Sequence, residues 1–330
     1  MQQLTGSELE TARHLIGRIS TIFSATVIGQ DNLRRALISA LLAEGHVLLE
    51  SVPGLAKTTA AHTLASAISG SFHRIQCTPD LMPNDIVGTQ VFNYTTGELT
   101  TQLGPVHANL VLLDEINRSS AKTQSAMLEA MQERQTTIGG RVYPVPRPFM
   151  VMATQNPIEE EGTYVLPEAQ MDRFLIKEVL SYPSSEDEVQ ILDAIAAGTL
   201  GGARREVSDP ITLEEVSQLQ KYTRRVFVHE SLKRYIVDII ATTRSRSDIA
   251  VADLETQVRV GASPRGAIAL MQVAQALALM AARSYVVPDD IVQMRHAVLR
   301  HRIIRTYDAI AAGISTETII DRIFDAVPVP

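Results

Sequence analysis

The stretch LLESVPGLAKTT, residues 48–59, decides the fold class of this chain. It joins the apolar run HVLLE (46–50), which has the length of a buried strand, to the helix-like segment TTAAHTLASAIS (58–69). A phosphate-binding loop lies in this setting and follows the pattern G-x-x-x-x-G-K-[ST]. Here Ser51 and Ala56 occupy the two glycine positions, and Gly54 lies between them. We interpret the stretch as a phosphate-binding loop with one costly substitution. An ordinary turn before a surface lysine is the alternative that the loop alone leaves open.

The substituted positions differ in their expected cost. Such a loop directs backbone N–H groups at phosphate oxygens, and glycine serves where φ is positive or a side chain would clash. Ala56 adds only a methyl group, which is tolerable if its backbone is close to helical. A positive φ at Ser51 would cost roughly 1 kcal/mol or more, so Ser51 is the larger expected departure. Pro53 followed by Gly54 predicts a rigid bend and then a permissive residue.

Polar residues with catalytic chemistry follow in a fixed order along the chain. Lys57 is expected to reach the β- and γ-phosphates, and the Thr58 hydroxyl is a ligand for Mg²⁺. The run NLVLLDE (109–115) is typical of a strand buried on both faces. Its final carboxylates suit two roles: Asp114 holds the water shell of Mg²⁺, and Glu115 polarises an attacking water. Two solvated acids at a strand end are the alternative interpretation.

Three later segments add weaker candidates. ATQNP (153–157) places Asn156 after another buried strand, within reach of a γ-phosphate oxygen and the attacking water. QMDRF (170–174) places Arg173 before a strand, although a surface ion pair would equally explain one arginine. GASPRG (261–266) places Arg265 in the first turn of a helix, where a cation is electrostatically unfavourable. An anionic partner would explain that position.

The order of elements predicts an α/β domain with a parallel sheet, because buried strands alternate with helices. Thr96-Gly97 and Gly139-Gly140 indicate two hairpins, and Asp31 is the expected N-cap of a helix over 31–45. The Gly-rich segment GTLGGARR (198–205) reads as a linker, beyond which only helices are expected. The predicted domains are therefore residues 1–197, an α/β nucleotide-binding domain, and 206–330, a smaller helical domain.

Composition narrows the function classes. The formal net charge of −7 disfavours a broad electrostatic grip on DNA or anionic membrane. The single cysteine, Cys77, excludes an internal disulfide and is expected to be a buried or half-buried thiol. No apolar run reaches the length of a membrane span, and the N-terminus has no secretory signal, so a cytoplasmic location is expected.

Together these segments resemble the AAA+ ATPases, and more narrowly their MoxR family. SVPGLAKT is similar to the Walker A motif, LVLLDE to Walker B, and VIGQ (27–30) to the stretch around the adenine. EINRSSAKTQSAMLEAMQE, ATQNPIEEEGTYVLPEAQMDRF and GASPRG are similar to MoxR signature stretches. The resemblance runs from about residue 25 to residue 302. It implies a P-loop NTPase core, a helical lid, and the cofactors ATP and Mg²⁺.

The resemblance also implies roles for individual residues. The implied nucleotide-binding residues are Val27, Ile28, Gly29, Gln30, Ser51, Val52, Pro53, Gly54, Leu55, Ala56, Lys57, Thr58 and Thr59. Thr58 and Asp114 would ligate Mg²⁺, and Glu115 would activate water. Asn156 resembles sensor 1. Arg265 resembles sensor 2, acting in cis or in trans, and Arg173 resembles the arginine finger of a neighbouring subunit.

The implied function is a ring-shaped homo-oligomer, a hexamer, that remodels or matures a protein client. A separate protein with a von Willebrand factor A domain is an implied partner. Two other functions stay open. One is a nucleotide-binding scaffold with little turnover, because Ser51 distorts the loop. The other is a nucleic-acid motor of the same clade, which the net charge disfavours.

Overall fold

The computed structural model describes residues 3–52, 54–157, 164, 166–198, 209–247 and 249–330. The chain forms two compact units, each assembled from separate segments. The core unit consists of Leu15–Leu166 and Glu178–Ser217. The lid unit consists of Met1–His14, Pro167–Lys177 and Gln218–Pro330. No helix of the described residues is long and apolar enough to cross a membrane.

A five-stranded sheet organises the core unit and confirms the predicted α/β class. Its strand order is β2-β5-β8-β1-β9, and β1, β2, β5 and β8 pair in parallel. The strands are β1 (Val47–Glu50), β2 (Phe72–Gln76), β5 (Leu110–Asp114), β8 (Met150–Gln155) and β9 (Ile176–Val179). Every residue of β5 and the first five of β8 are buried, as continuous apolar runs predict. The carboxyl ends of these strands therefore meet at one edge, where ligands bind in such sheets.

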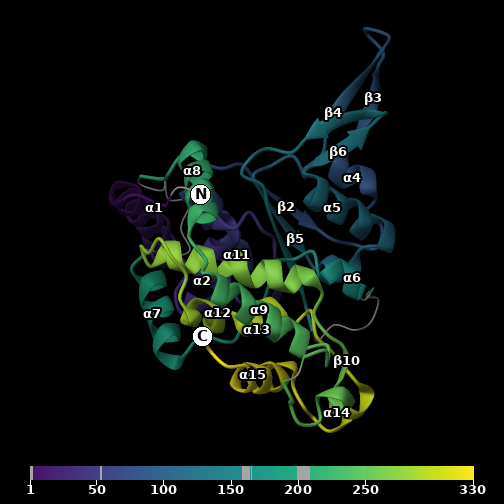
Figure 1. Ribbon diagram of the computed structural model, residues 1–330. Coiled ribbons are helices and arrows are strands. Elements are labelled where there is room, and N and C mark those ends of the chain that lie inside the picture. Colours follow the sequence, from purple (N-terminus) through teal and green to yellow (C-terminus); the bar gives the residue numbers. More distant parts are fainter. Residues whose placement is uncertain (1–2, 53, 158–163, 165, 199–208, 248) are drawn as a thin grey trace. The chain divides into compact units, whose positions relative to one another are not determined.

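Helices and two hairpins complete the core unit (Figure 1). The helices are α1 (Gly6–Ser24, which begins in the lid unit), α2 (Asp31–Leu42), α3 (Lys57–Ala67), α4 (Pro83–Val87), the 3₁₀ turn η1 (Ile116–Arg118), α5 (Ala121–Glu133) and α7 (Ser185–Ala196). The hairpins are β3 (Gly88–Asn93) with β4 (Glu98–Leu103), and β6 (Gln135–Ile138) with β7 (Arg141–Pro144). Both predicted hairpins are thus present. Asp31 is the first helical residue of α2, not its cap, since Gln30 holds the N-cap position.

The lid unit is mainly helical. It contains α6 (Glu168–Met171), α8 (Leu213–Arg225, which begins in the core unit), α9 (Glu230–Thr242), α10 (Leu254–Gln257), α11 (Pro264–Met280), α12 (Pro288–Gln293), α13 (Arg295–Leu299), α14 (Tyr307–Ala311) and α15 (Thr316–Ala326). The expectation of helices alone was wrong, because β10 (Val258–Val260) pairs with β11 (Ile304–Arg305) in an antiparallel ladder. The C-terminal helix α15 packs within the unit, where Phe324 contacts Tyr235 edge to face.

The predicted linker at residues 198–205 would divide the chain once, but the two units are each assembled from several segments. Residues 199–205 lie outside the described residues. The segment Pro167–Lys177 belongs to the lid unit although it precedes that division. Arg302 explains this grouping, because its guanidinium donates to Asp172 at 2.9 Å and to the carbonyls of Phe174 and Leu175. The predicted linker and its boundaries stay predictions.

Cys77 follows β2 inside the core unit and confirms the expected buried thiol. Its side chain is 1% exposed, and its N–H donates to the Asp114 carbonyl at 2.9 Å. Burial raises the pKa of the thiol to about 12.

Candidate functional site

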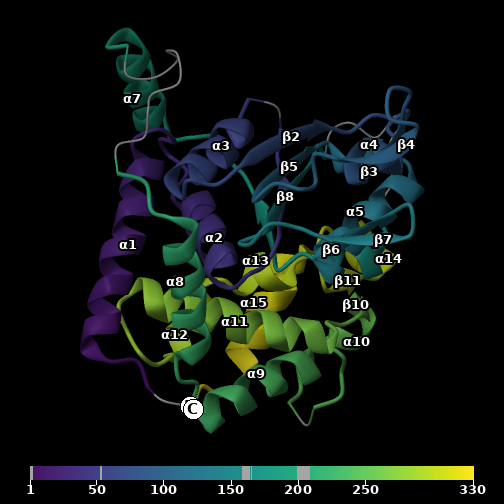
Figure 2. The ribbon, with the colours of Figure 1, turned by 90° about the horizontal axis from the view of Figure 1, so that it is seen from above.

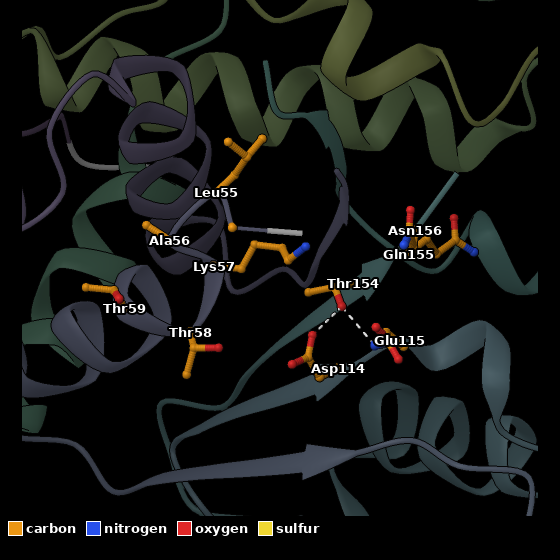
Figure 3. Close-up of a pocket in the computed structure, with 11 residues that line it drawn as sticks. Leu55, Ala56, Lys57, Thr58, Thr59, Asp114, Glu115, Thr154, Gln155 and Asn156 are labelled. Carbon is orange, nitrogen blue, oxygen red and sulfur yellow. Dashed lines mark hydrogen bonds between the residues drawn. The ribbon is translucent and has the colours of Figure 1, made fainter. Parts of the chain in front are cut away.

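One cavity of the core unit brings nine of the predicted site residues together. It has a volume of about 330 Å³ and is lined by Gly54, Leu55, Ala56, Lys57, Thr58, Thr59, Asp114, Glu115, Thr154, Gln155 and Asn156. Figure 3 shows the Lys57 side chain extending into the space bordered by Asp114 and Thr154, with the Thr58 hydroxyl directed toward Asp114. These groups come from the loop after β1, the end of β5 and the end of β8. Because the three strands are parallel neighbours, their carboxyl ends bring the groups together.

The backbone of the loop corrects the expected location of strain. Ala56 has φ 53° and ψ 23°, a left-handed conformation, and Gly54 has φ 88°. Ser51 is not among the described residues with positive φ. The costly substitution is therefore Ala56, the N-cap of α3, and the concern over Ser51 was wrong. Pro53 lies outside the described residues.

Ser51 instead contacts the site lysine through its side chain. The Lys57 ammonium donates to Ser51 Oγ at 2.7 Å and to the Val52 carbonyl at 3.1 Å. The Ser51 hydroxyl in turn donates to the Val52 carbonyl at 3.0 Å, and Ser51 is 2% exposed. An ammonium has three N–H donors, so these contacts leave one for a ligand. Burial lowers the pKa of Lys57, while the nearby carboxylates of Asp114 and Glu115 oppose that shift.

Thr154, which the sequence analysis overlooked, links the two acidic residues. Its hydroxyl donates to Asp114 Oδ1 at 2.7 Å and accepts from the Glu115 N–H at 2.8 Å (Figure 3). The signal was the register of two buried parallel strands, because Leu113 pairs with Ala153 and so brings Asp114 beside Thr154. The Asp114 carboxylate also accepts from Arg74 Nη2 at 2.5 Å. Arg74 lies on β2, the neighbouring strand, and was likewise overlooked.

Glu115 lies at a sharp turn where β5 ends. Its backbone is left-handed, with φ 58°, which is uncommon outside glycine and is found at functional sites. The carboxylate is held from two sides, since it pairs with Arg118 at 3.0 Å and accepts from Gln76 Nε2 at 3.2 Å. The turn and these contacts fix the Glu115 side chain at the rim of the cavity.

Asn156 directly follows the last residue of β8, beside the start of the loop. It is 8% exposed and lines the cavity. The Ser51 N–H donates to the Gln155 carbonyl at 3.1 Å, which connects the loop to the residue before Asn156. This position is consistent with a residue that senses the occupant of the cavity.

A second cavity contains the predicted adenine stretch. Val27, Ile28, Gly29 and Gln30 line a volume of about 390 Å³ together with Asp187 and Gln190 of α7. Gly29 has φ 70°, and a Cβ atom there would lie 2.8 Å from the Asp187 side chain, so any other residue would be strained and would require Asp187 to shift. The sequence analysis did not predict α7. Figure 2 shows this helix at the margin of the core unit, and none of its residues is buried.

The two predicted arginines belong to the lid unit. Arg173 follows α6, and its Nε is buried without a partner among the described residues. Arg265 is exposed in the first turn of α11, where its N–H donates to Ser263 Oγ at 3.1 Å.

The donor chemistry fits Mg²⁺ bound together with a nucleotide. Mg²⁺ is usually held by one or two carboxylates, waters and substrate phosphates. Asp114 and the Thr58 hydroxyl provide such a partial set beside Lys57. Within the described part of the chain, no group of three or more His, Cys, Asp or Glu residues could form a closed cage for a metal ion.

Comparisons with known proteins agree with this architecture. The profile of the ATPase family associated with various cellular activities (AAA) matches residues 46–176, and that of the AAA lid domain matches residues 252–323. Chaperone MoxR1 of Mycobacterium tuberculosis is 44% identical, over 98% of this chain and 84% of its own. The uncharacterized protein YeaC of Bacillus subtilis is 43% identical, over 97% of each chain. A crystal structure of a Cytophaga hutchinsonii protein is 40% identical with a TM-score of 0.91, covering 98% of this chain and 97% of that one.

The MoxR proteins of Methylorubrum extorquens and Paracoccus denitrificans also match, at 26% and 29% identity over 96% and 93% of this chain. The two-part domain match, the near-complete coverage and the site geometry agree. The chain therefore belongs to the MoxR family of AAA ATPases.

Proposed function

We propose that this protein hydrolyses ATP to ADP and phosphate in a Mg²⁺-dependent reaction at the cavity around Lys57. The observation that carries the proposal is the Thr154 bridge, which holds Asp114 and Glu115 beside Lys57 and Thr58. A surface pair of acids would have no such support from a neighbouring buried strand.

Each residue then has a defined task. The backbone N–H groups of residues 54–59 and the Lys57 ammonium bind the β- and γ-phosphates. Thr58 and Asp114 would hold Mg²⁺, which neutralises charge on the phosphates when bound. Glu115 accepts a proton from the attacking water, and Asn156 orients that water against the γ-phosphate. Val27, Ile28, Gly29 and Gln30 contact the adenine in the second cavity.

We further propose that the protein acts as a ring, a homohexamer, that remodels a protein client. Two observations support an assembled form. The relative MoxR1 is named a chaperone. Arg173 and Arg265 are carried by the lid unit, apart in sequence from the loop that would bind phosphate. In a ring, Arg173 would complete the site of a neighbouring subunit. A separate protein with a von Willebrand factor A domain is the proposed partner.

Steady-state ATP hydrolysis across a range of protein concentrations tests the proposal. We expect activity per subunit to rise with concentration. Glu115→Gln should lower kcat by at least about 100-fold, and Arg173→Ala by about 1000-fold, while ATP still binds. Matched controls are Glu129→Gln on α5 and Arg13→Ala on α1, both exposed, which should retain wild-type turnover.

Two results would contradict the proposal. If the wild type binds ATP without turnover at any concentration, it is a nucleotide-binding scaffold. If Arg173→Ala retains full activity, the residue does not complete a site. Chelation of Mg²⁺ by EDTA should abolish hydrolysis. Addition of excess Mg²⁺ should restore it.

A further inference from the structure

Asp172 lies between α6 and Arg173, and its carboxylate joins two distant parts of the lid unit. One carboxylate oxygen accepts from Arg302 Nε at 2.9 Å. The other accepts from Ser263 Oγ at 2.7 Å. Ser263 is the N-cap of α11, and the same hydroxyl accepts the N–H of Arg265. A single carboxylate therefore connects the residue before Arg173 to the cap of the helix that carries Arg265.

Arg302 makes this connection rigid. Its side chain is 2% exposed, and besides Asp172 it donates to the carbonyls of Phe174 at 2.7 Å, Leu175 at 3.2 Å and Val298. The neighbouring ring of His301 shares the Phe174 carbonyl at 3.0 Å. Burial lowers the pKa of His301 well below its usual range, so the ring is neutral and its Nε2–H donates. The residues that follow Arg173 are thus fixed to the segment after α13.

The part of the chain before Arg173 is also held by an ion pair. Glu168 of α6 pairs with Arg259 of β10 at 2.7 Å. The chain around Arg173 is therefore held on both sides by ion pairs within the lid unit, of which the Asp172–Arg302 pair is buried and the Glu168–Arg259 pair is half exposed. Removing the Asp172 carboxylate would leave the buried charge of Arg302 uncompensated.

We infer that Asp172 is a positioning residue that holds Arg173 and Arg265 in one fixed arrangement, so that both cations reach a phosphate together. The inference rests on the proposed function, in which these arginines contact nucleotide phosphates. It adds a specific mechanism: the two arginines move as one body, and the Asp172–Ser263 hydrogen bond transmits motion between them.

Kinetics of Asp172→Asn provide the first test. The change keeps the shape of the side chain and removes its charge. We expect kcat to fall roughly 10- to 100-fold, because a small displacement of catalytic groups has that effect. The ATP dissociation constant should stay within about twofold, since the loop around Lys57 belongs to the core unit. Asp238→Asn on α9 is the matched control, because it breaks only the exposed pair with Arg234.

A double-mutant cycle separates positioning from general destabilisation. The cycle treats the two arginines as one unit: in a protein that carries both Arg173→Ala and Arg265→Ala, Asp172→Asn should cause almost no additional loss of kcat. Full multiplicative losses would show that Asp172 acts independently of the arginines and would overturn the inference. A parallel loss of ATP affinity, or wild-type kcat in Asp172→Asn, would overturn it too.

Ser263 offers a second pair of variants that does not depend on the survival of Asp172→Asn. Asparagine and aspartate both cap helices well. Ser263→Asn keeps a donor for Asp172 and should retain activity. Ser263→Asp places a second carboxylate against Asp172 and should lose kcat as Asp172→Asn does. Equal activity of the two variants would contradict the role of this hydrogen bond.

Amide hydrogen exchange tests the connection without using catalysis. In Ser263→Asp, the amides of Arg173 and Phe174 should exchange faster together with those of Arg265 and Gly266, whereas Ser263→Asn should protect both groups as the wild type does. Faster exchange at only one group would overturn the inference. If the wild type shows no ATP hydrolysis, the proposed function fails, and this measurement still decides whether the two segments are joined.

Discussion

Two residues of the phosphate-binding loop differ in their roles: Ala56 has a strained backbone, and Ser51 contacts Lys57 through its side chain. Ala56 adopts a left-handed backbone conformation at φ 53°, which places its Cβ close to the following carbonyl. Ser51 has no such strain, and its hydroxyl occupies a buried position as an acceptor for Lys57. The loop therefore tolerates alanine at a strained position and uses serine for a specific contact.

Ala56→Gly should stabilise the protein. Glycine adopts the left-handed region without steric cost, so we expect a gain of roughly 1 kcal/mol in the free energy of unfolding. Urea denaturation measures it. Ala60→Gly is the control, because Ala60 lies inside α3 and its replacement should cost about 1 kcal/mol. A loss in both variants would show that Ala56 is not strained.

Ser51→Ala and Ser51→Gly should both weaken ATP binding by about threefold to tenfold, because each removes one acceptor of the Lys57 ammonium. Isothermal titration calorimetry provides the dissociation constants. Ser51→Thr keeps the hydroxyl and should bind as the wild type does. Tighter binding by Ser51→Gly would instead indicate that a strained serine backbone limits the loop.

Strand β8 is the element that assembles the catalytic groups. It pairs with β5 on one side and β1 on the other, so its final residues lie between the acidic pair and the loop. The apolar runs made these strands predictable, because strands buried on both faces show no alternation. Their order was not predictable, because it depends on long-range pairing. Thr154 and Arg74 were missed for that reason, since each acts from a neighbouring strand.

Thr154→Val should lower kcat about 10- to 100-fold while leaving ATP affinity within about threefold. Valine has the same shape but neither donates to Asp114 nor accepts from the Glu115 N–H, so the acidic pair loses its alignment. Single-turnover hydrolysis and ATP titration report the two quantities. Thr100→Val on β4 removes an exposed hydroxyl bond to the Val91 carbonyl and should change neither. An equal effect of both variants would contradict the role of Thr154.

His46 connects three elements at the opposite end of the sheet. It precedes β1, accepts from the Val151 N–H of β8 at 3.0 Å and lies 3.2 Å from the Met131 carbonyl of α5. Burial lowers the pKa of His46 from 6.5 to about 4. Between these pH values the imidazole of His46 is protonated in the unfolded protein and neutral in the folded protein. Stability from His46 is therefore complete above pH 6.5 and is lost as the pH falls toward 4.

His46→Gln should flatten the pH dependence of stability in that window. The wild type should lose up to about 3 kcal/mol more than the variant between pH 6.5 and 4. Chemical denaturation at several pH values measures the difference. His14→Gln, at an exposed position on α1, should keep the wild-type slope. Identical slopes for the wild type and His46→Gln would show that this ring titrates normally.

At the scale of the whole molecule, the chain crosses repeatedly between its two units. The segment with Arg173 joins the lid unit through Asp172, Phe174 and Leu175, which all accept hydrogen bonds from Arg302. Local patterns identified the longer helices of this unit. They did not identify its short helices α6, α10 and α14, nor the contacts of residues 167–177 with Arg302, which lies far away in the sequence. The same limit hid the β10–β11 pair, whose strands are too short for a periodic signal.

Mixing inactive subunits should restore activity if Arg173 acts across a boundary. Glu115→Gln supplies an intact Arg173, and Arg173→Ala supplies an intact Glu115, so mixed rings contain some complete sites. We expect about a quarter of the interfaces in an equal mixture to be complete, from random assortment of subunits in a closed ring. ATP hydrolysis after co-refolding or subunit exchange measures it. A mixture as inactive as its components would place Arg173 in its own site.

The buried thiol of Cys77 has a practical consequence for labelling chemistry. It is the single cysteine of the chain, it is 1% exposed, and its pKa of about 12 keeps it protonated. Thiolate is the species that reacts with maleimides and iodoacetamides, so the native protein offers them no competing target. A cysteine introduced at Thr95, in the turn between β3 and β4, would thus be the single attachment point for a fluorophore or spin label. Distances within a working assembly become measurable without first rebuilding the protein.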